Sequence, residues 1–143
     1  MPPSLAQAVR RLYREVHPGW PELPGPHFWA YPTVVALDRP GSVLGYGSYS
    51  MNVSDHGDLS IMLQDSGVAE FARGRGLARE LLKYRVTIGR AVGAQCAVGM
   101  TQPDNAAMLH ILRSEGFEEI RTIERAYPDG KDGRLFIKKL KGL

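Results

Sequence analysis

Hydrophobic positions recur along the chain with two different spacings, and these spacings predict its first elements. Apolar residues three or four apart predict an opening helix over residues 5–16. The segments Thr33–Leu37 and Val43–Val53 are rich in β-branched and aromatic residues and flank a turn-like Pro-Gly pair, so they predict a hairpin. From Leu59 the apolar and polar residues alternate, which predicts a third strand running through Val68.

The second half of the chain returns to helical spacing and then to strands. A helix is expected to begin at Leu77 and to end at Gly93, and Ala94–Met100 reads as a short buried strand. Asp104 is expected to cap a further helix that runs through Ser114 and is ended by Gly116. Residues 117–126 and 133–140 predict two closing strands. The helix that starts at Leu77 is expected to pack through one face made of Leu77, Leu81, Tyr84, Ile88 and Val92.

This order of elements predicts an α+β fold with a mixed, mostly antiparallel central sheet and helices on both faces. At 143 residues the chain is expected to form one domain spanning residues 1–143. Residues 17–32 are rich in proline and glycine and predict a long connection or lid rather than regular structure.

Composition indicates the class of protein and its location more than the reaction that it could carry out. Hydrophobic residues make up 43% of the chain and charged residues 23%, which is ordinary for a globular protein. The formal net charge of +3 mildly favours an anionic partner but does not by itself indicate nucleic acid. The single cysteine, Cys96, cannot form an intrachain disulfide, so a cytoplasmic location is expected. No apolar run is long enough to cross a bilayer, and no histidine or cysteine spacing suggests a metal site.

The most informative stretch is VAEFARGRGLARELL, residues 68–82, where glycines and arginines stand between a predicted strand and a predicted helix. A helix that begins after a glycine-rich turn offers unpaired backbone N–H groups and a positive dipole end to an anion. Gly74 and Gly76 let the backbone come close, while Arg73, Arg75 and Arg79 could add charge-assisted bonds. A diphosphate site is one interpretation, and a surface loop with solvated arginines is the other.

The same residues resemble the signature of the GNAT acetyltransferase superfamily: Arg or Gln, two residues, Gly, one residue, then Gly or Ala. RGRGLA at residues 73–78 fits this pattern. The similarity continues upstream in DSGV at 65–68, and downstream in DNAAML at 104–109 and GF at 116–117. Four ordered blocks at family-like spacing make this resemblance stronger than the hexapeptide alone would.

The resemblance implies a GNAT-like three-layer fold that binds acetyl-coenzyme A, with the first strand of the usual fold apparently missing. The strand ending at Val68 would pair with the pantetheine arm, and Asn105 would lie near the pantetheine or the acceptor. An amine would then attack the thioester directly in a ternary complex. The pyrophosphate would be held by the turn and the start of the helix, with contributions from Arg73, Gly74, Arg75, Gly76, Leu77, Ala78 and Arg79.

Proton transfer is the least defined part of this interpretation. An acceptor ammonium must lose a proton before it attacks, so a base or a water chain is expected. Asp65, Glu70 and His56 are the candidates, with Asp65 preferred because it lies near the expected cofactor site. The alternative for Asp65 is a bond to the local backbone, which is the commoner role of a carboxylate at a glycine-containing bulge. The tyrosine that serves as the acid in many family members stands seven residues after the asparagine, and here that position is Leu112.

Three functions remain open from the sequence. The first is an N-acetyltransferase acting on a primary amine of a small molecule or a peptide. The second is a GNAT-like module that binds an acyl-coenzyme A without fast chemistry, which Leu112 favours. The third is a basic nucleic-acid-binding domain, which the small net charge disfavours. Neither a nucleic acid nor a membrane is expected as a partner, whereas a homodimer is plausible.

Overall fold

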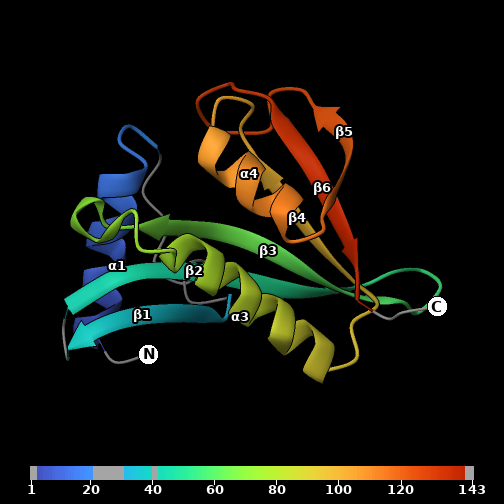
Figure 1. Cartoon of the computed structure of the whole chain (residues 1–143), viewed down its shortest axis with the longest axis horizontal. Coiled ribbons are helices and arrows are strands. Elements are labelled where there is room, and N and C mark those ends of the chain that lie inside the picture. Colours follow the sequence, from blue (N-terminus) through green and yellow to red (C-terminus); the bar gives the residue numbers. More distant parts are fainter. Residues whose placement is uncertain (1–2, 21–30, 40–41, 141–143) are drawn as a thin grey trace. The chain divides into compact units, whose positions relative to one another are not determined.

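The computed structural model describes residues 3–20, 31–39 and 42–140. The strands of this part form a six-stranded sheet with the order β1-β2-β3-β4-β6-β5 (Figure 1). The strands are β1 (Thr33–Arg39), β2 (Ser42–Val53), β3 (Leu59–Val68), β4 (Cys96–Thr101), β5 (Glu118–Ile123) and β6 (Gly133–Lys139). The helices are α1 (Pro3–Val16), the short 3₁₀ helix η1 (Glu70–Ala72), α3 (Leu77–Ala91) and α4 (Ala106–Ser114).

The sheet is mixed, as the sequence predicted. β3 and β4 run parallel, with Ser60 paired to Cys96 and Met62 paired to Val98. The pairs β1–β2, β4–β6 and β5–β6 are antiparallel. The first element in the described part of the chain is the helix α1, in agreement with the expected order. The predicted fold class is therefore confirmed.

The chain divides into two compact units. Unit 1 comprises residues 1–49 and 64–85, and unit 2 comprises residues 50–63 and 86–143. Strands β2 and β3 and helix α3 each contribute residues to both units. The single domain over residues 1–143 stays a prediction.

In unit 1 the two helices lie on opposite faces of the strands (Figure 1). Tyr46 on β2 is fully buried in a cluster with α1 residues that include Val9 and Leu12. Alternate residues of a strand point to opposite faces, so Gly45 and Gly47 face the other way. A side chain at Gly45 would meet Leu81 of α3 at 3.2 Å. The small residues of β2 therefore give α3 room to pack closely.

Gly67 on β3 allows a similarly close approach of α1. A Cβ atom at this position would lie 2.8 Å from Val16 Cγ2 and 3.0 Å from Tyr46 Cε1. Alanine would force a branched side chain and a buried ring apart, so we expect Gly67→Ala to lower the free energy of unfolding by about 2 kcal/mol.

Chemical denaturation would measure this change, and Gly99→Ala on β4 is the matched control. A Cβ at Gly99 would meet Leu112 and Leu63 at 3.5 Å, an ordinary contact distance. Equal free energies of unfolding for the two variants would contradict the proposed crowding at Gly67.

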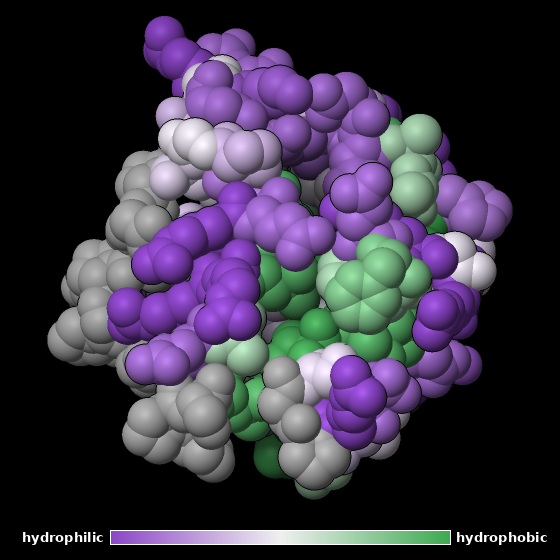
Figure 2. Space-filling model, turned by 90° about the vertical axis from the view of Figure 1, so that its left-hand side faces the viewer, coloured by the Kyte–Doolittle hydropathy of each residue, from purple (hydrophilic) through white to green (hydrophobic). Residues whose placement is uncertain are grey.

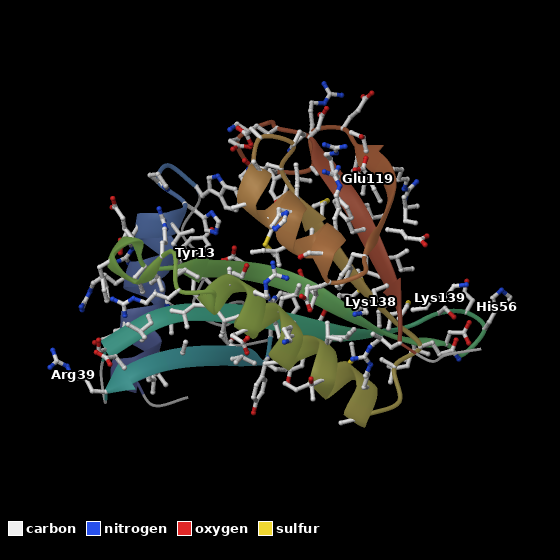
Figure 3. The ribbon with its side chains drawn as sticks, viewed as in Figure 1. Tyr13, Arg39, His56, Glu119, Lys138 and Lys139 are labelled. Atoms are coloured by element: carbon white, nitrogen blue, oxygen red, sulfur yellow. The ribbon has the colours of Figure 1, made fainter. Side chains whose placement is uncertain are left out.

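In unit 2, helix α4 packs through Leu109 and Leu112, both of which are buried. The helix is capped by Asn105, whose side-chain oxygen accepts the Met108 N–H at 3.1 Å. The predicted cap, Asp104, is wrong because its carboxylate instead accepts a bond from Lys131 at 2.7 Å. Glu119 on β5, labelled in Figure 3, pairs with Arg134 on β6 at 2.7 Å. Gly116 has a φ of +86° directly after α4, in agreement with a glycine stop.

The predicted packing face of α3 is partly wrong. Tyr84 is 61% exposed and Val92 is 53% exposed, while Leu81 is buried as expected. The buried positions include Leu82 and Arg85, with exposed fractions of 0% and 1%. The buried face of α3 is rotated relative to the predicted face, because the charged residue Arg85 occupies a buried position that a hydrophobicity pattern assigns to solvent.

The predicted connection 17–32 is described only at its two ends. Residues 17–20 form a turn after α1, in which the Trp20 N–H donates to the His17 carbonyl at 3.1 Å. The centre of the expected lid, including Trp29, lies outside the described residues. In the part of the chain that the structure describes, no helix is long and apolar enough to span a membrane.

Candidate active site

The glycine–arginine turn predicted as an anion site links η1 to α3 in unit 1. β3 ends at Val68, η1 follows at Glu70–Ala72, and α3 begins at Leu77. Gly74 and Gly76 both have a φ of +79°, in the left-handed region that glycine adopts without steric cost. The two glycines therefore shape the turn, and the helix starts immediately after it.

The turn presents backbone donors to open space. The first residues of an α-helix have N–H groups without an intrahelical acceptor. Here the Glu80 N–H donates to the Gly76 carbonyl at 3.0 Å, so the amides of Leu77 and Ala78 precede this first helical bond. No heavy atom lies within 4 Å of a Cβ built at Gly74 or Gly76. This cradle fits a diphosphate, which needs several convergent N–H donors and a close backbone.

Two of the three arginines brace the turn itself. Arg73 Nε donates to the Val68 carbonyl at 3.2 Å, and Arg75 Nη2 donates to the Phe71 carbonyl at 3.5 Å. Arg79 lies in the first turn of α3. The guanidinium groups thus add positive charge around the helix start, where the dipole already favours an anion.

The surface at this end of unit 1 is not uniformly charged. Phe71 in η1 is 65% exposed and Leu37 on β1 is 48% exposed. Figure 2, which faces the left-hand side of Figure 1, shows hydrophobic residues in green reaching the surface among hydrophilic ones in purple. A ligand at this end would meet apolar as well as basic groups.

Asn105 and the neighbouring cavity belong to unit 2. An open cavity of about 470 Å³ lies along α4 and is lined by Ala106, Leu109, His110, Arg113 and Ser114. The oxygen of the Asn105 side chain caps α4, which leaves its amide NH₂ as the group with which it could meet a ligand. Its expected place near the pantetheine stays a prediction.

Asp65, the preferred candidate base, lies at the centre of a side-chain cluster in unit 1. Its Oδ1 is 2.6 Å from His17 Nε2, and its Oδ2 accepts a bond from the Tyr46 hydroxyl. The His17 ring stacks on Trp20 with centroids 4.0 Å apart, and Tyr13, labelled in Figure 3, meets it edge-on at 5.1 Å. We expected a carboxylate here to bond to the local backbone, and the structure instead gives it two side-chain partners from other elements.

A buried cation lies on the α3 side of the same strands. Arg85 is 1% exposed, and it donates from Nη1 to the Ser48 carbonyl at 3.0 Å and from Nε to the Leu81 carbonyl at 3.1 Å. The Ser48 hydroxyl in turn donates to the Asp65 carbonyl at 3.1 Å. Burial lowers the pKa of the Arg85 guanidinium to about 10, and the Asp65 carboxylate opposes that shift. Arg85 therefore remains charged at neutral pH.

Tyr46 serves as a permanent donor to Asp65. Burial, and then the nearby Asp65 carboxylate, raise the pKa of the Tyr46 phenol well above its ordinary value. The hydroxyl keeps its proton throughout the physiological pH range and holds one carboxylate oxygen in place.

The other candidates for proton transfer lie outside this cluster. His56 is exposed in the turn between β2 and β3, where its N–H donates to Ser54 Oγ at 3.3 Å. Glu70 is exposed in η1. Leu112 is 1% exposed on α4, where it packs as a core residue. Among the described residues, no group of three or more histidine, cysteine or acidic side chains could hold a metal ion.

Sequence reasoning missed His17 and Arg85. His17 stands four residues after Tyr13, one helical turn further along, and this spacing was the available signal. The contact from His17 to Asp65 spans 48 positions, and the contact from Arg85 to Ser48 spans 37. Local patterns do not report pairings of this range.

Comparison with known proteins shows a match along most of the chain. Residues 6–117 match the model of the acetyltransferase (GNAT) family. Two curated proteins, from Pseudomonas aeruginosa and Pseudomonas paraeruginosa, are L-methionine sulfoximine/L-methionine sulfone acetyltransferases that are 35% identical over 88 residues. This alignment covers 62% of the chain and 51% of each relative, so the chain spans about half the length of the curated relatives that it matches.

Solved structures share the fold. The NAA60 protein of Arabidopsis thaliana, in complex with a bisubstrate analogue, has a TM-score of 0.87 at 16% identity, covering 100% of this chain and 97% of that one. The ribosomal-protein-alanine N-acetyltransferase of Brucella melitensis has a TM-score of 0.75 at 26% identity, covering 96% and 93%.

Proposed function

The chain belongs to the acetyltransferase (GNAT) family, and we propose that it is an acetyl-coenzyme A-dependent N-acetyltransferase. The acceptor is a primary amine of a small molecule or a peptide, and the amine attacks the thioester directly in a ternary complex. The observation that carries this proposal is the turn at Arg73–Ala78, where two left-handed glycines open directly onto the start of α3. Coenzyme A has the diphosphate that such a turn fits.

Each residue of the turn has a defined part in binding. The amides of Gly74, Arg75, Gly76, Leu77 and Ala78 hold the pyrophosphate, and Arg73 and Arg79 add positive charge. The backbone of β3 at Val68 pairs with the pantetheine arm, and Asn105 contributes its amide NH₂. When bound, acetyl-coenzyme A supplies an activated acetyl group on a thiol that leaves readily.

The family and the relatives support a proposal for the class of acceptor. The curated relatives act on L-methionine sulfoximine and L-methionine sulfone, and the Brucella structure is that of a ribosomal-protein-alanine N-acetyltransferase. L-Methionine sulfoximine, L-methionine sulfone and alanine all contain an α-amino nitrogen. We infer the same group for this chain, carried by a free amino acid or by the N-terminus of a peptide.

The proposal is tested by thiol release from acetyl-coenzyme A across a panel of amino acids and peptides. We expect amine-dependent release together with an increase in Tm on addition of coenzyme A, since a ligand that binds the native state stabilises it. Stabilisation by coenzyme A without release on any amine would favour the acyl-coenzyme A-binding module. Absence of both effects would contradict a coenzyme A site, and salt-dependent binding of DNA or RNA would then support the nucleic-acid alternative.

We add two expectations to this function, one for the cellular compartment and one for the oligomeric state. We infer a reducing, cytoplasmic compartment from the single cysteine, Cys96, which has the Ser60 hydroxyl 3.2 Å from its Sγ. We also infer a homodimer, because β1 is at one end of the strand order and an open edge can be covered by a second chain.

A further inference from the structure

We propose that His17, oriented by Asp65, takes the proton from the acceptor ammonium through its Nδ1 atom. The inference rests on the proposed N-acetyltransferase function and assigns a residue to its first proton transfer. It also changes the role predicted for Asp65, from the base to the group that positions the base.

The occupancy of the Asp65 carboxylate supports this change of role. Its Oδ1 is engaged by His17 at 2.6 Å and its Oδ2 by the Tyr46 hydroxyl. Taking a proton from an amine would compete with one of these bonds, whereas His17 has a second ring nitrogen. Of the two ring nitrogens of His17, only Nε2 has a hydrogen-bond partner among the described residues.

The bond to Asp65 also selects the tautomer of His17. An ionised carboxylate only accepts hydrogen bonds, so the proton of this bond is carried by Nε2. In the neutral ring Nδ1 then carries a lone pair, which is the state that a general base requires. A carboxylate that holds a histidine in one tautomer has the same role in the Ser-His-Asp triad.

The position of the ring is restricted from two sides. Trp20 stacks on it at 4.0 Å with an interplanar angle of 10°, and Tyr13 meets it at 61°. The side chain of His17 is nevertheless 15% exposed, so it is not fully enclosed by the described residues. A ring that is held in one orientation loses little entropy when it meets a substrate.

The charges around His17 suit a base that becomes cationic. In the described part of the structure, the titratable groups shown in contact with His17 are Asp65 from β3 and Tyr13 from α1, while Tyr46 from β2 contacts the other oxygen of Asp65. Tyr46 stays neutral, and the Asp65 carboxylate stabilises the imidazolium once it forms. Arg85, from the α3 side, is a buried cation that interacts electrostatically with the Asp65 carboxylate.

The ammonium of the acceptor, R–NH₃⁺, passes one proton to Nδ1 and becomes R–NH₂, while His17 becomes an imidazolium. The amine lone pair forms the new C–N bond to the acetyl carbon, and the C–S bond breaks. The departing thiolate takes the second proton of the amine nitrogen, and the imidazolium returns its proton to water.

A pair of small primary amines with very different basicity separates a base from a structural residue, because each amine is compared between the variant and the unaltered enzyme. Ethylamine is protonated at pH 7.5, whereas 2,2,2-trifluoroethylamine is largely neutral and needs no base to expose its lone pair. We expect His17→Gln to lower kcat/KM for ethylamine by about 100-fold and that for the fluorinated amine by less than about 3-fold. Asp65→Asn should act in the same direction, and His56→Gln in the exposed turn is the control that should change neither rate.

Equal losses on both amines would overturn the proposal, since a structural defect does not distinguish a protonated from a neutral acceptor. An unchanged rate with ethylamine would overturn it as well. If the unaltered enzyme binds coenzyme A but acetylates neither amine, the proposed function fails for these acceptors, and the tautomer of His17 decides the inference separately.

That tautomer can be measured without any acceptor. NMR of the protein labelled with ¹⁵N-histidine, assigned by comparison with His17→Gln, reports which ring nitrogen of His17 carries the proton. We expect the neutral ring to carry its proton on Nε2, with the ¹⁵N shift altered in Asp65→Asn. A proton on Nδ1 in the neutral ring would overturn the assignment.

Discussion

Replacing Gly76 with valine is expected to lower the affinity for acetyl-coenzyme A by about 100-fold or more. A β-branched residue does not adopt the φ of +79° seen at Gly76 without strain, so the turn must rearrange. Its side chain would also fill the open space beside the first amides of α3. Isothermal titration calorimetry with coenzyme A would measure the loss.

Gly57→Val is the matched control for this experiment. Gly57 has a φ of +84°, and a Cβ atom at this position would have no heavy atom within 4 Å, so valine there carries the same backbone strain. Gly57 lies in the turn between β2 and β3 rather than at the start of a helix. Both variants should lose similar stability, and only Gly76→Val should lose affinity. Unchanged affinity in Gly76→Val would contradict the assignment of the pyrophosphate turn.

Arg85→Ala is expected to lower the free energy of unfolding by about 3 kcal/mol. The substitution removes a long side chain that is 1% exposed, and it takes the donors from the carbonyls of Ser48 and Leu81. Both the empty volume and the unsatisfied Ser48 carbonyl, in a residue that is 4% exposed, contribute to the loss. Urea denaturation followed by circular dichroism would measure it.

The control lies in the same helix. Arg90 is in the last turn of α3 and is exposed, so Arg90→Ala should change the free energy of unfolding by no more than about 0.5 kcal/mol. A similarly small effect for Arg85→Ala would show that the buried guanidinium contributes nothing net to stability.

Most helices and strands were predictable because short-range signals define them. The alternation from Leu59 to Val68 and the glycine after α4 gave elements that the structure confirms. The turn between β3 and α3 was also predictable, because glycines stand between a predicted strand and a predicted helix. These glycines have positive φ in the structure. Such signals need only the covalent geometry of a few neighbouring residues.

The wrong predictions concern polar residues whose burial or hydrogen-bond partner cannot be inferred from the neighbouring sequence. Tyr84 was placed in the packed face of α3, yet Arg85 occupies that face because two backbone carbonyls accept its donors. Asp104 was taken as the cap of α4, whereas Lys131 engages it and Asn105 caps the helix. Each case involves a contact that is distant in sequence: the Ser48 carbonyl lies 37 positions from Arg85, and Lys131 lies 27 positions from Asp104. The cap by Asn105 depends in addition on the geometry of the turn before α4.

The candidate site likewise has one part that was predictable from the sequence and one part that was not. The turn at residues 73–78 is contiguous in sequence, so its place between β3 and α3 was predictable, and its contacts with a pyrophosphate are proposals. The cluster around Asp65 draws on α1, β2 and β3, and only the tertiary fold brings His17 and Tyr46 to this carboxylate. The sequence identified one member of the cluster and not the residue that we propose as the base.

The contact between Gly47 and Arg85 has a consequence for how related sequences can diverge. A Cβ at Gly47 would lie 2.7 Å from both Cζ and Nε of Arg85, so any side chain at position 47 displaces the guanidinium. The two positions are therefore expected to covary: an alanine or larger residue at 47 should be accompanied by a shorter residue at 85. Arginine at 85 should be found only together with glycine at 47.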